Sequence, residues 1–204
     1  MTCYNAASTI EESVRSVIAQ TFTNWELVLV DNCSTDDSMA IVRRIGDARI
    51  RITKLERNHG RTPALNIGLN NARGEYLAIL DADDLSTPDR LQLQVDCLDN
   101  NPNLVLVASW YRNINSGGEL INEVNTPTQH LDLVRVLASN CPFMNSAVMF
   151  RTEAAKRLGG YNETFQYSQD LDLWLGLAKL GELGRQIANT GPAASTPTPT
   201  ASQP

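Results

Sequence analysis

The sequence predicts one α/β domain with a mixed, mainly parallel sheet flanked by helices. Short apolar segments alternate with amphipathic ones along most of the chain, which is the order expected when helices connect the strands of a parallel sheet. A Gly-Gly pair inside the segment 111–121 interrupts this order and predicts a hairpin, which adds an antiparallel part to the sheet. We assign residues 1–184 to this domain, because the pattern ends there.

The first half of the chain alternates regularly. "STIEESVRSVIAQ" predicts an amphipathic helix over 8–20, with Ser8 and Glu11 in the spacing of a capping box. A strand at 25–31, a helix at 34–47 and a strand at 49–56 follow. Thr62 and Pro63 predict the start of the next helix, and Gly74 its end. A strand at 75–81, a helix at 86–102 and a strand at 104–110 complete the alternation.

The second half is less regular. After the predicted hairpin come a strand at 146–150 and helices at 152–160 and 169–181. The two ends do not fit the pattern. The chain reaches its first helix directly after "MTCYN", so we expect the first strand of the sheet to be missing. Residues 185–204 are rich in Pro, Thr and Ser without apolar periodicity, and we expect this tail to be disordered.

Composition limits the function classes. The 204 residues carry a net charge of −6 without any basic block, which argues against a nucleic-acid partner. No apolar run approaches the ~20 residues of a membrane span, so we expect no transmembrane segment. We expect a cytoplasmic location, with peripheral association at the inner face of the membrane as the alternative. The four cysteines form no CxxC pair and indicate reduced, structural thiols.

The stretch "GEYLAILDADDLSTPDRL" places three carboxylates, Asp81, Asp83 and Asp84, directly after a predicted strand. Ligands of open α/β sheets bind at the carboxyl ends of the strands. One carboxylate there is explained by capping of the following helix, but three close carboxylates favour a cation. An EF-hand loop is excluded because Ser86 and Gln92 occupy its required Gly and Glu positions. The pattern is typical of Mg²⁺ or Mn²⁺ shared with substrate phosphates.

Three segments of the chain together resemble the family-2 glycosyltransferases, which have the GT-A fold. The segments are "CYNAASTIEESVRSVIAQTFTNWELVLVDNCSTDDS", "LNIGLNNARGEYLAILDADD" and "PFMNSAVMFRTEAAKRLGGYNETFQYSQDLDLWL", and they stand in the family's order. The resemblance covers residues 2 to about 183. It implies an inverting, metal-dependent transfer of a sugar from a nucleoside diphosphate sugar to an acceptor hydroxyl. A UDP-sugar donor is expected, and the acceptor is expected to be a saccharide, a lipid-linked compound or another hydroxyl compound.

The resemblance also implies roles for particular residues. Tyr4 and Asp31 match positions that hold the nucleotide base; alternatively, Asp31 is a solvated turn residue and Tyr4 a core residue. Asp81 and Asp83 match the DxD motif, in which Asp83 binds Mn²⁺ or Mg²⁺ and Asp81 binds the donor ribose or the same metal. Asp84 is a less certain third member of this group.

The remaining matches concern the donor diphosphate and the base. Asn58, Gly60 and Arg61 match the loop that lines the diphosphate, although Arg61 is equally well explained as a surface charge. Asp170 in "SQDLDLW" matches the catalytic base, and its alternative is a simple helix-start residue.

Three positions depart from the family pattern. Gln169 stands where Glu is usual, and Gly176 and Leu65 stand where many members have Arg. Gln169, Gly176 and the missing strand suggest an alternative function, a non-catalytic nucleotide-sugar-binding remnant. A phosphatase of the haloacid dehalogenase type is a further alternative, because "DADDL" resembles its nucleophile motif, but Leu85 stands where Thr or Val is expected.

Overall fold

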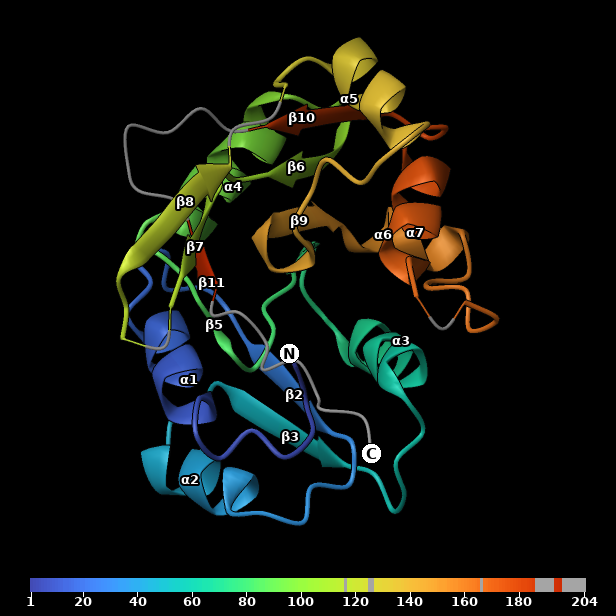
Figure 1. Ribbon diagram of the computed structural model, residues 1–204. Helices are drawn as coiled ribbons and strands as arrows, with labels where there is room; N and C mark the ends of the chain where they lie inside the picture. The colour runs from blue at the N-terminus through green and yellow to red at the C-terminus, as the bar shows by residue number, and fades with distance from the viewer. Residues whose placement is uncertain (116, 125–126, 166, 186–192, 196–204) are drawn as a thin grey trace.

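The computed structural model describes residues 1–115, 117–124, 127–165, 167–185 and 193–195. The strands and helices form a mixed α/β arrangement, which confirms the predicted fold class (Figure 1). Backbone hydrogen bonds join the described strands into three separate groups rather than one continuous sheet. Within the described residues, no helix has the length and apolar character needed to cross a bilayer.

The first sheet has the order β1-β2-β3 and is entirely parallel. Its strands are β1 (Thr2–Cys3), β2 (Leu27–Asp31) and β3 (Ile50–Lys54). We expected the first strand of the sheet to be missing, and the structure has only two residues at that place, Thr2 and Cys3, which pair with Val30 and Asp31 of β2. Strand propensity and apolar periodicity do not detect so short a strand, because its pairing with β2 is what defines it.

Three helices accompany this sheet: α1 (Ile10–Ile18), α2 (Ser38–Ile45) and α3 (Arg61–Asn71). The predicted capping box does not form, since α1 begins at Ile10 and its N-cap Thr9 makes no side-chain capping hydrogen bond. Helix α2 ends at Gly46, which adopts the left-handed conformation that favours glycine. Helix α3 begins at Arg61 with Gly60 as its N-cap, two residues before Pro63, the predicted first helical position, and it ends three residues before Gly74.

The second sheet has the order β10-β6-β9-β4. Its strands are β4 (Tyr76–Ala78), β6 (Leu104–Ala108), β9 (Val148–Arg151) and β10 (Glu182–Arg185). Strand β9 lies antiparallel to both β4 and β6, whereas β10 and β6 are parallel. The antiparallel share of the sheet is therefore larger than the alternation of elements predicted, because a late strand inserts between two early ones.

The helices around the second sheet are α4 (Arg90–Asn100), α5 (His130–Leu137), α6 (Thr152–Arg157) and α7 (Gln169–Leu177), and a 3₁₀ helix spans Asn145–Ala147. Helix α5 and strand β10 were not predicted. The main apolar core lies here, where Trp174 of α7 packs against Phe150 and Tyr161 at ring-centroid distances of 5.5 and 6.4 Å.

The third sheet has the order β5-β11-β7-β8. Strands β7 (Tyr111–Ile114) and β8 (Leu120–Val124) form the predicted antiparallel hairpin. Strand β11 (Ala193–Ser195) pairs with β7 and with β5 (Asp84–Leu85). Residues 193–195 thus form a strand inside the tail that we expected to be disordered, and most of that tail, 186–192 and 196–204, lies outside the described residues. A composition rich in Pro and Thr did not predict this pairing, because the partner edges come from residues far apart in the sequence.

Candidate active site

Asp31 ends β2 and is fully buried. Its Oδ1 atom accepts a hydrogen bond from the Ser34 backbone N–H at 2.9 Å, while its Oδ2 atom is buried without a hydrogen-bond partner among the described residues. The pairing of Cys3 with Asp31 brings Tyr4, which is 52% exposed, to the same carboxyl edge of the sheet. A buried carboxylate oxygen without a donor is costly, so this atom is available to accept a hydrogen bond from a bound ligand.

The loop before α3 is held by a side chain that the sequence reasoning missed, Asn32. Its Nδ2 atom donates to Asn58 Oδ1 at 2.9 Å and to the Gly60 carbonyl at 3.1 Å, and its Oδ1 atom accepts from the His59 N–H at 2.9 Å. Gly60 is the N-cap of α3 at φ 88°, a conformation that other residues adopt only with strain. This arrangement fixes Asn58 and Gly60 at the amino end of a helix, where backbone N–H groups favour anions.

Arg61 joins this loop to the acidic cluster. Its Nη2 atom donates to Asp81 Oδ2 at 2.7 Å, and the Arg61 side chain is about half exposed. Burial by itself would lower the pKa of Arg61, but the charges of Asp81, Asp170 and Asp83 together raise it. One guanidinium therefore lies within electrostatic range of carboxylates from two segments of the chain that are far apart in sequence.

Asp83 and Asp84 both have raised pKa values. Burial is the main cause for Asp83, and the charge of Asp81 adds to it. Burial raises the pKa of Asp84 to about 7, helped by the charges of Asp81 and Asp83 and opposed by a hydrogen bond from Ser146. Asp84 is only 4% exposed and opens β5, so it is the least accessible of the three carboxylates. Strand β5 is an edge strand of the third sheet, so the low exposure of Asp84 comes from packing around that edge.

No three Asp, Glu, His or Cys side chains converge as a ready-made metal site within the described residues. The donor set nevertheless suits a magnesium-type ion. Asp81 and Asp83 repel each other at one site, which raises the pKa of Asp83, and such ions take one or two protein carboxylates and leave other positions to phosphate and water. A divalent cation at Asp81 and Asp83 would relieve that repulsion.

Asp170 is the second residue of α7 and is partly buried. Its Oδ1 atom accepts a hydrogen bond from the Leu171 N–H at 2.9 Å, and the helix begins after Ser168, which has a left-handed φ of 60°. The neighbouring Gln169 is 7% exposed, so this departure from the family pattern points into the protein. Asp170 keeps an oxygen that can accept a proton, because the helix start engages only Oδ1 in the described contacts.

Asn66 of α3 is bonded to Tyr161, which lies in the connection between α6 and α7, and sequence reasoning singled out neither residue. Asn66 donates to the Tyr161 carbonyl at 2.8 Å and accepts from the Tyr161 N–H at 2.8 Å. The Tyr161 hydroxyl is buried without a partner among the described residues, and burial raises its pKa, helped by the charges of Asp81 and Asp170. The only sequence signal was an Asn inside an otherwise apolar helix stripe, which is too common to identify a site.

The other two departures are packing positions. Leu65 is 5% exposed and belongs to the main core, so the Arg of many family members would not fit there unchanged. A Cβ atom at Gly176 would lie 3.0 Å from the Leu158 side chain, so a larger residue would have to displace Leu158. Neither position contacts the acidic cluster in the described structure.

Comparison with known proteins identifies the family. The model of glycosyl transferase family 2 matches residues 1–159. EpsE of Bacillus subtilis (strain 168) is 31% identical over 196 residues, which cover 92% of this chain and 68% of EpsE. The UDP-Glc:alpha-D-GlcNAc-diphosphoundecaprenol beta-1,3-glucosyltransferase WfgD of Escherichia coli is 31% identical over 180 residues, which cover 88% of this chain and 68% of WfgD.

Solved structures agree in fold. The crystal structure of S. aureus TarS 1-349 in complex with UDP-GlcNAc superimposes with a TM-score of 0.81 at 20% identity and covers 97% of this chain, which spans 57% of that structure. Mannosyltransferase PcManGT from Pyrobaculum calidifontis, in complex with GDP-Man and Mn²⁺, superimposes with a TM-score of 0.73 at 22% identity. The match covers 98% of this chain and 56% of the PcManGT chain. The phosphatase alternative is therefore wrong, and the chain belongs to glycosyltransferase family 2.

Proposed function

We propose that this chain transfers a sugar from a nucleoside diphosphate sugar, with a UDP-sugar as the leading candidate, to an acceptor hydroxyl with inversion at the anomeric carbon. The observation that carries the proposal is the position of Arg61. Its guanidinium donates to Asp81 at 2.7 Å, and the charges of Asp83 and Asp170 raise its pKa. In this proposal Arg61 is the phosphate-binding cation, Asp81 and Asp83 are the metal-binding carboxylates, and Asp170 is the base. The UDP and UDP-GlcNAc complexes of TarS support the donor class.

The donor would bind along the carboxyl edge of the first sheet. The buried Oδ2 atom of Asp31 would accept the hydrogen bond of a uracil imide N–H, and Tyr4 would line the base. Asn58, Gly60 and Arg61 would face the diphosphate, because the amino end of α3 and a guanidinium both favour anions. A glycine at φ 88° lets the backbone approach the phosphates closely.

Asp81 and Asp83 would hold Mn²⁺ or Mg²⁺. When bound, such an ion supplies positive charge beside the diphosphate leaving group. The Mn²⁺ in the PcManGT complex supports this choice of cofactor. Arg61, which bonds Asp81, would turn toward the phosphates, because about half of its side chain is exposed.

Asp170 would act as the base. Its carboxylate would take the proton of the acceptor hydroxyl as that oxygen bonds to the anomeric carbon. The bond from the anomeric carbon to the diphosphate breaks on the opposite side, and its electron pair leaves with the nucleoside diphosphate. Attack opposite to the leaving group inverts the anomeric configuration. WfgD is named for a lipid-linked acceptor, which supports a lipid-linked saccharide among the acceptor classes.

Two substitutions test this proposal with a panel of nucleotide sugars and Mn²⁺. Asp83→Ala should abolish Mn²⁺-dependent donor binding in calorimetry, because the diphosphate would then face Asp81 and Asp84 without a bridging ion. Asp170→Asn should leave donor affinity within a few-fold and lower transfer or donor hydrolysis by roughly 10²- to 10⁴-fold, the usual size of a general-base contribution.

Two exposed carboxylates outside the proposed site serve as controls. Asp172→Asn changes an exposed carboxylate two residues after Asp170, and Asp96→Ala removes an exposed one on α4; neither should alter binding or transfer. An Asp170→Asn variant that transfers sugar at the parental rate would remove Asp170 from the mechanism. Donor binding by the parental chain without any turnover would favour the non-catalytic remnant.

A further inference from the structure

The acidic residues 81–84 form a hydrogen-bonded turn. The Asp84 N–H donates to the Asp81 carbonyl at 3.2 Å, so Asp81 and Asp83 stand at the first and third positions of one turn. The backbone of the turn sets the directions in which these two side chains point. Because Mg²⁺ demands near-octahedral coordination, the contacts that hold this backbone bear directly on the proposed metal site.

Two buried serines from distant segments bind the backbone of this turn. Ser146, in the 3₁₀ helix before β9, accepts a hydrogen bond from the Asp81 N–H with its Oγ atom at 3.0 Å. Ser13, in α1, donates its hydroxyl to the Ala82 carbonyl at 2.9 Å. Ser146 is 1% exposed and Ser13 is 0% exposed, so water does not compete for these bonds. The turn is therefore held from two sides by elements that are far from it in sequence.

Ser146 also contacts the last residue of the turn. Its hydroxyl donates to the Asp84 carboxyl, and this bond lowers the pKa of Asp84 against the larger, opposite effect of burial. One hydroxyl thus accepts a hydrogen bond from the first residue of the turn and donates one to the fourth. A methyl group in its place would leave the buried Asp81 N–H without that partner, which costs more than an average hydrogen bond contributes.

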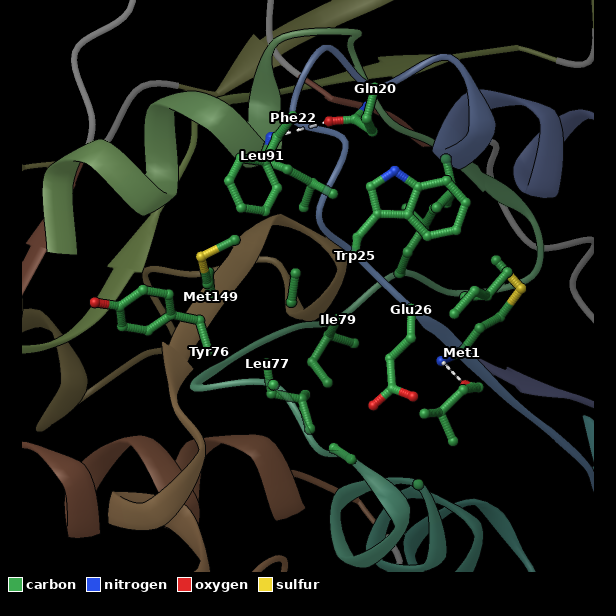
Figure 2. A pocket seen from close by; sticks show the side chains of 18 of the residues that line it. Met1, Gln20, Phe22, Trp25, Glu26, Tyr76, Leu77, Ile79, Leu91 and Met149 are labelled. Carbon is green, nitrogen blue, oxygen red and sulfur yellow. Dashed lines mark hydrogen bonds between the residues drawn. The ribbon is translucent and has the colours of Figure 1, made fainter. Parts of the chain in front are cut away.

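Further polar side chains of α1 hold the segment after the turn. Ser16 Oγ accepts from the Ser86 N–H at 3.0 Å, and Gln20 Oε1 accepts from the Leu91 N–H at 2.9 Å (Figure 2 shows the second bond). Gln20, Ser86 and Leu91 line a cavity of about 700 Å³, which gives the segment no packing contacts on that side. Ser13, Ser16 and Gln20 are spaced three and four residues apart, so they form one polar stripe along α1.

We propose that Ser13 and Ser146 are positioning residues of the metal-binding turn: they hold its backbone so that the carboxylates of Asp81 and Asp83 reach one divalent cation. This inference rests on the proposed function, because it requires that these two carboxylates bind the ion. Both serine bonds end on the two residues that directly precede Asp83. Since the serines are buried and act through the backbone, neither is a catalytic residue.

The test measures UDP binding to the full 204-residue chain by calorimetry at a series of Mn²⁺ concentrations. This titration gives the half-saturating Mn²⁺ concentration and, separately, the affinity for UDP without metal. Ser146→Ala should raise the half-saturating Mn²⁺ concentration roughly 10- to 100-fold, the usual effect of removing a residue that orients metal ligands. Ser13→Ala should raise it about 10-fold, and it decides the question if Ser146→Ala does not fold. Affinity for UDP without Mn²⁺ should stay within about twofold in both variants.

Ser38→Ala is the matched control. Ser38 is 0% exposed, and its hydroxyl accepts from the Ala6 N–H at 2.8 Å and donates to Asp36. The substitution therefore removes the same kinds of contact as Ser146→Ala, but away from the acidic turn. Both variants should melt several degrees below the parental chain. Ser38→Ala should nevertheless keep the half-saturating Mn²⁺ concentration within about twofold of the parental value.

The outcomes distinguish a positioning role from a general effect on the fold. Half-saturating Mn²⁺ concentrations within about twofold of the parental value in both Ser146→Ala and Ser13→Ala would overturn the inference. An equal loss of UDP affinity with and without Mn²⁺, or the same rise in Ser38→Ala, would overturn it as well, because the serines would then only stabilise the fold. UDP binding by the parental chain that does not respond to Mn²⁺ would refute the proposed metal role itself, and the inference with it.

Discussion

Replacing Arg61 by Gln separates a donor-binding role from that of a surface charge. The Arg61–Asp81 pair has a 2.7 Å N–O distance, and the two side chains are 49% and 20% exposed. Exposed pairs contribute about 0.2–1 kcal/mol, so Arg61→Gln should lower the free energy of unfolding by no more than ~1 kcal/mol. A charge-assisted hydrogen bond to a phosphate is worth about 1.5–3 kcal/mol, which predicts that UDP with Mn²⁺ binds roughly 10- to 150-fold more weakly.

The same change should act oppositely on the metal alone. Arg61 occupies Asp81 Oδ2 and its charge opposes a nearby cation, so Arg61→Gln should leave Mn²⁺ affinity without nucleotide unchanged or raise it by up to about 5-fold, the equivalent of ~1 kcal/mol. Isothermal titration calorimetry with Mn²⁺ alone, and with UDP at saturating Mn²⁺, measures both effects. Arg57→Gln, an exposed arginine of the same loop, is the matched control and should change neither. If Arg61→Gln binds UDP as tightly as the Arg57 variant does, Arg61 only neutralises Asp81 and the reasoning fails.

Three further predictions concern stability. The pKa of the Met1 amine falls from 8.0 to about 6 on folding, so the unfolded chain binds more protons than the folded chain between these pH values. The free energy of unfolding should therefore rise between pH 6 and pH 8, by up to about 3 kcal/mol. Urea unfolding should show this pH dependence in the free chain and not in the N-terminally acetylated chain. Arg90→Ala should lower the free energy of unfolding by at least ~3 kcal/mol, because the buried guanidinium donates to the Ile79 and Val148 carbonyls and to Gln94. A decrease below ~1 kcal/mol in urea unfolding would contradict this reasoning. Gly160→Ala should lower the melting temperature by several degrees, because φ at this position is 79° and the added Cβ would lie 2.6 Å from Asn66 Oδ1. An unchanged melting temperature would show that the Asn66 side chain moves away without loss of stability.

Much of the candidate site was predictable because its residues form local patterns. Asp81, Asp83 and Asp84 follow an apolar run, and Asp31 ends another, so the rule that ligands bind at strand carboxyl ends places all four before the fold is known. The alternation of strands and helices likewise predicted β2, β3, α3 and α4 within a few residues. The assigned roles of the site residues, from Tyr4 to Asp170, stay predictions.

The sequence by itself determined most of the strand and helix alternation in the first half of the chain, the acidic cluster after β4 and the family, because apolar periodicity and short motifs are properties of neighbouring residues. Only the tertiary structure decided which distant groups meet. The bond from Arg61 to Asp81 spans 20 positions, and the bonds between Asn66 and Tyr161 span 95. The insertion of β9 between β4 and β6 and the two-residue β1 depend on strand edges that no local pattern predicts. Hydrogen bonds and packing between such segments form only when the folded chain brings the segments together. A local sequence pattern therefore cannot predict these contacts.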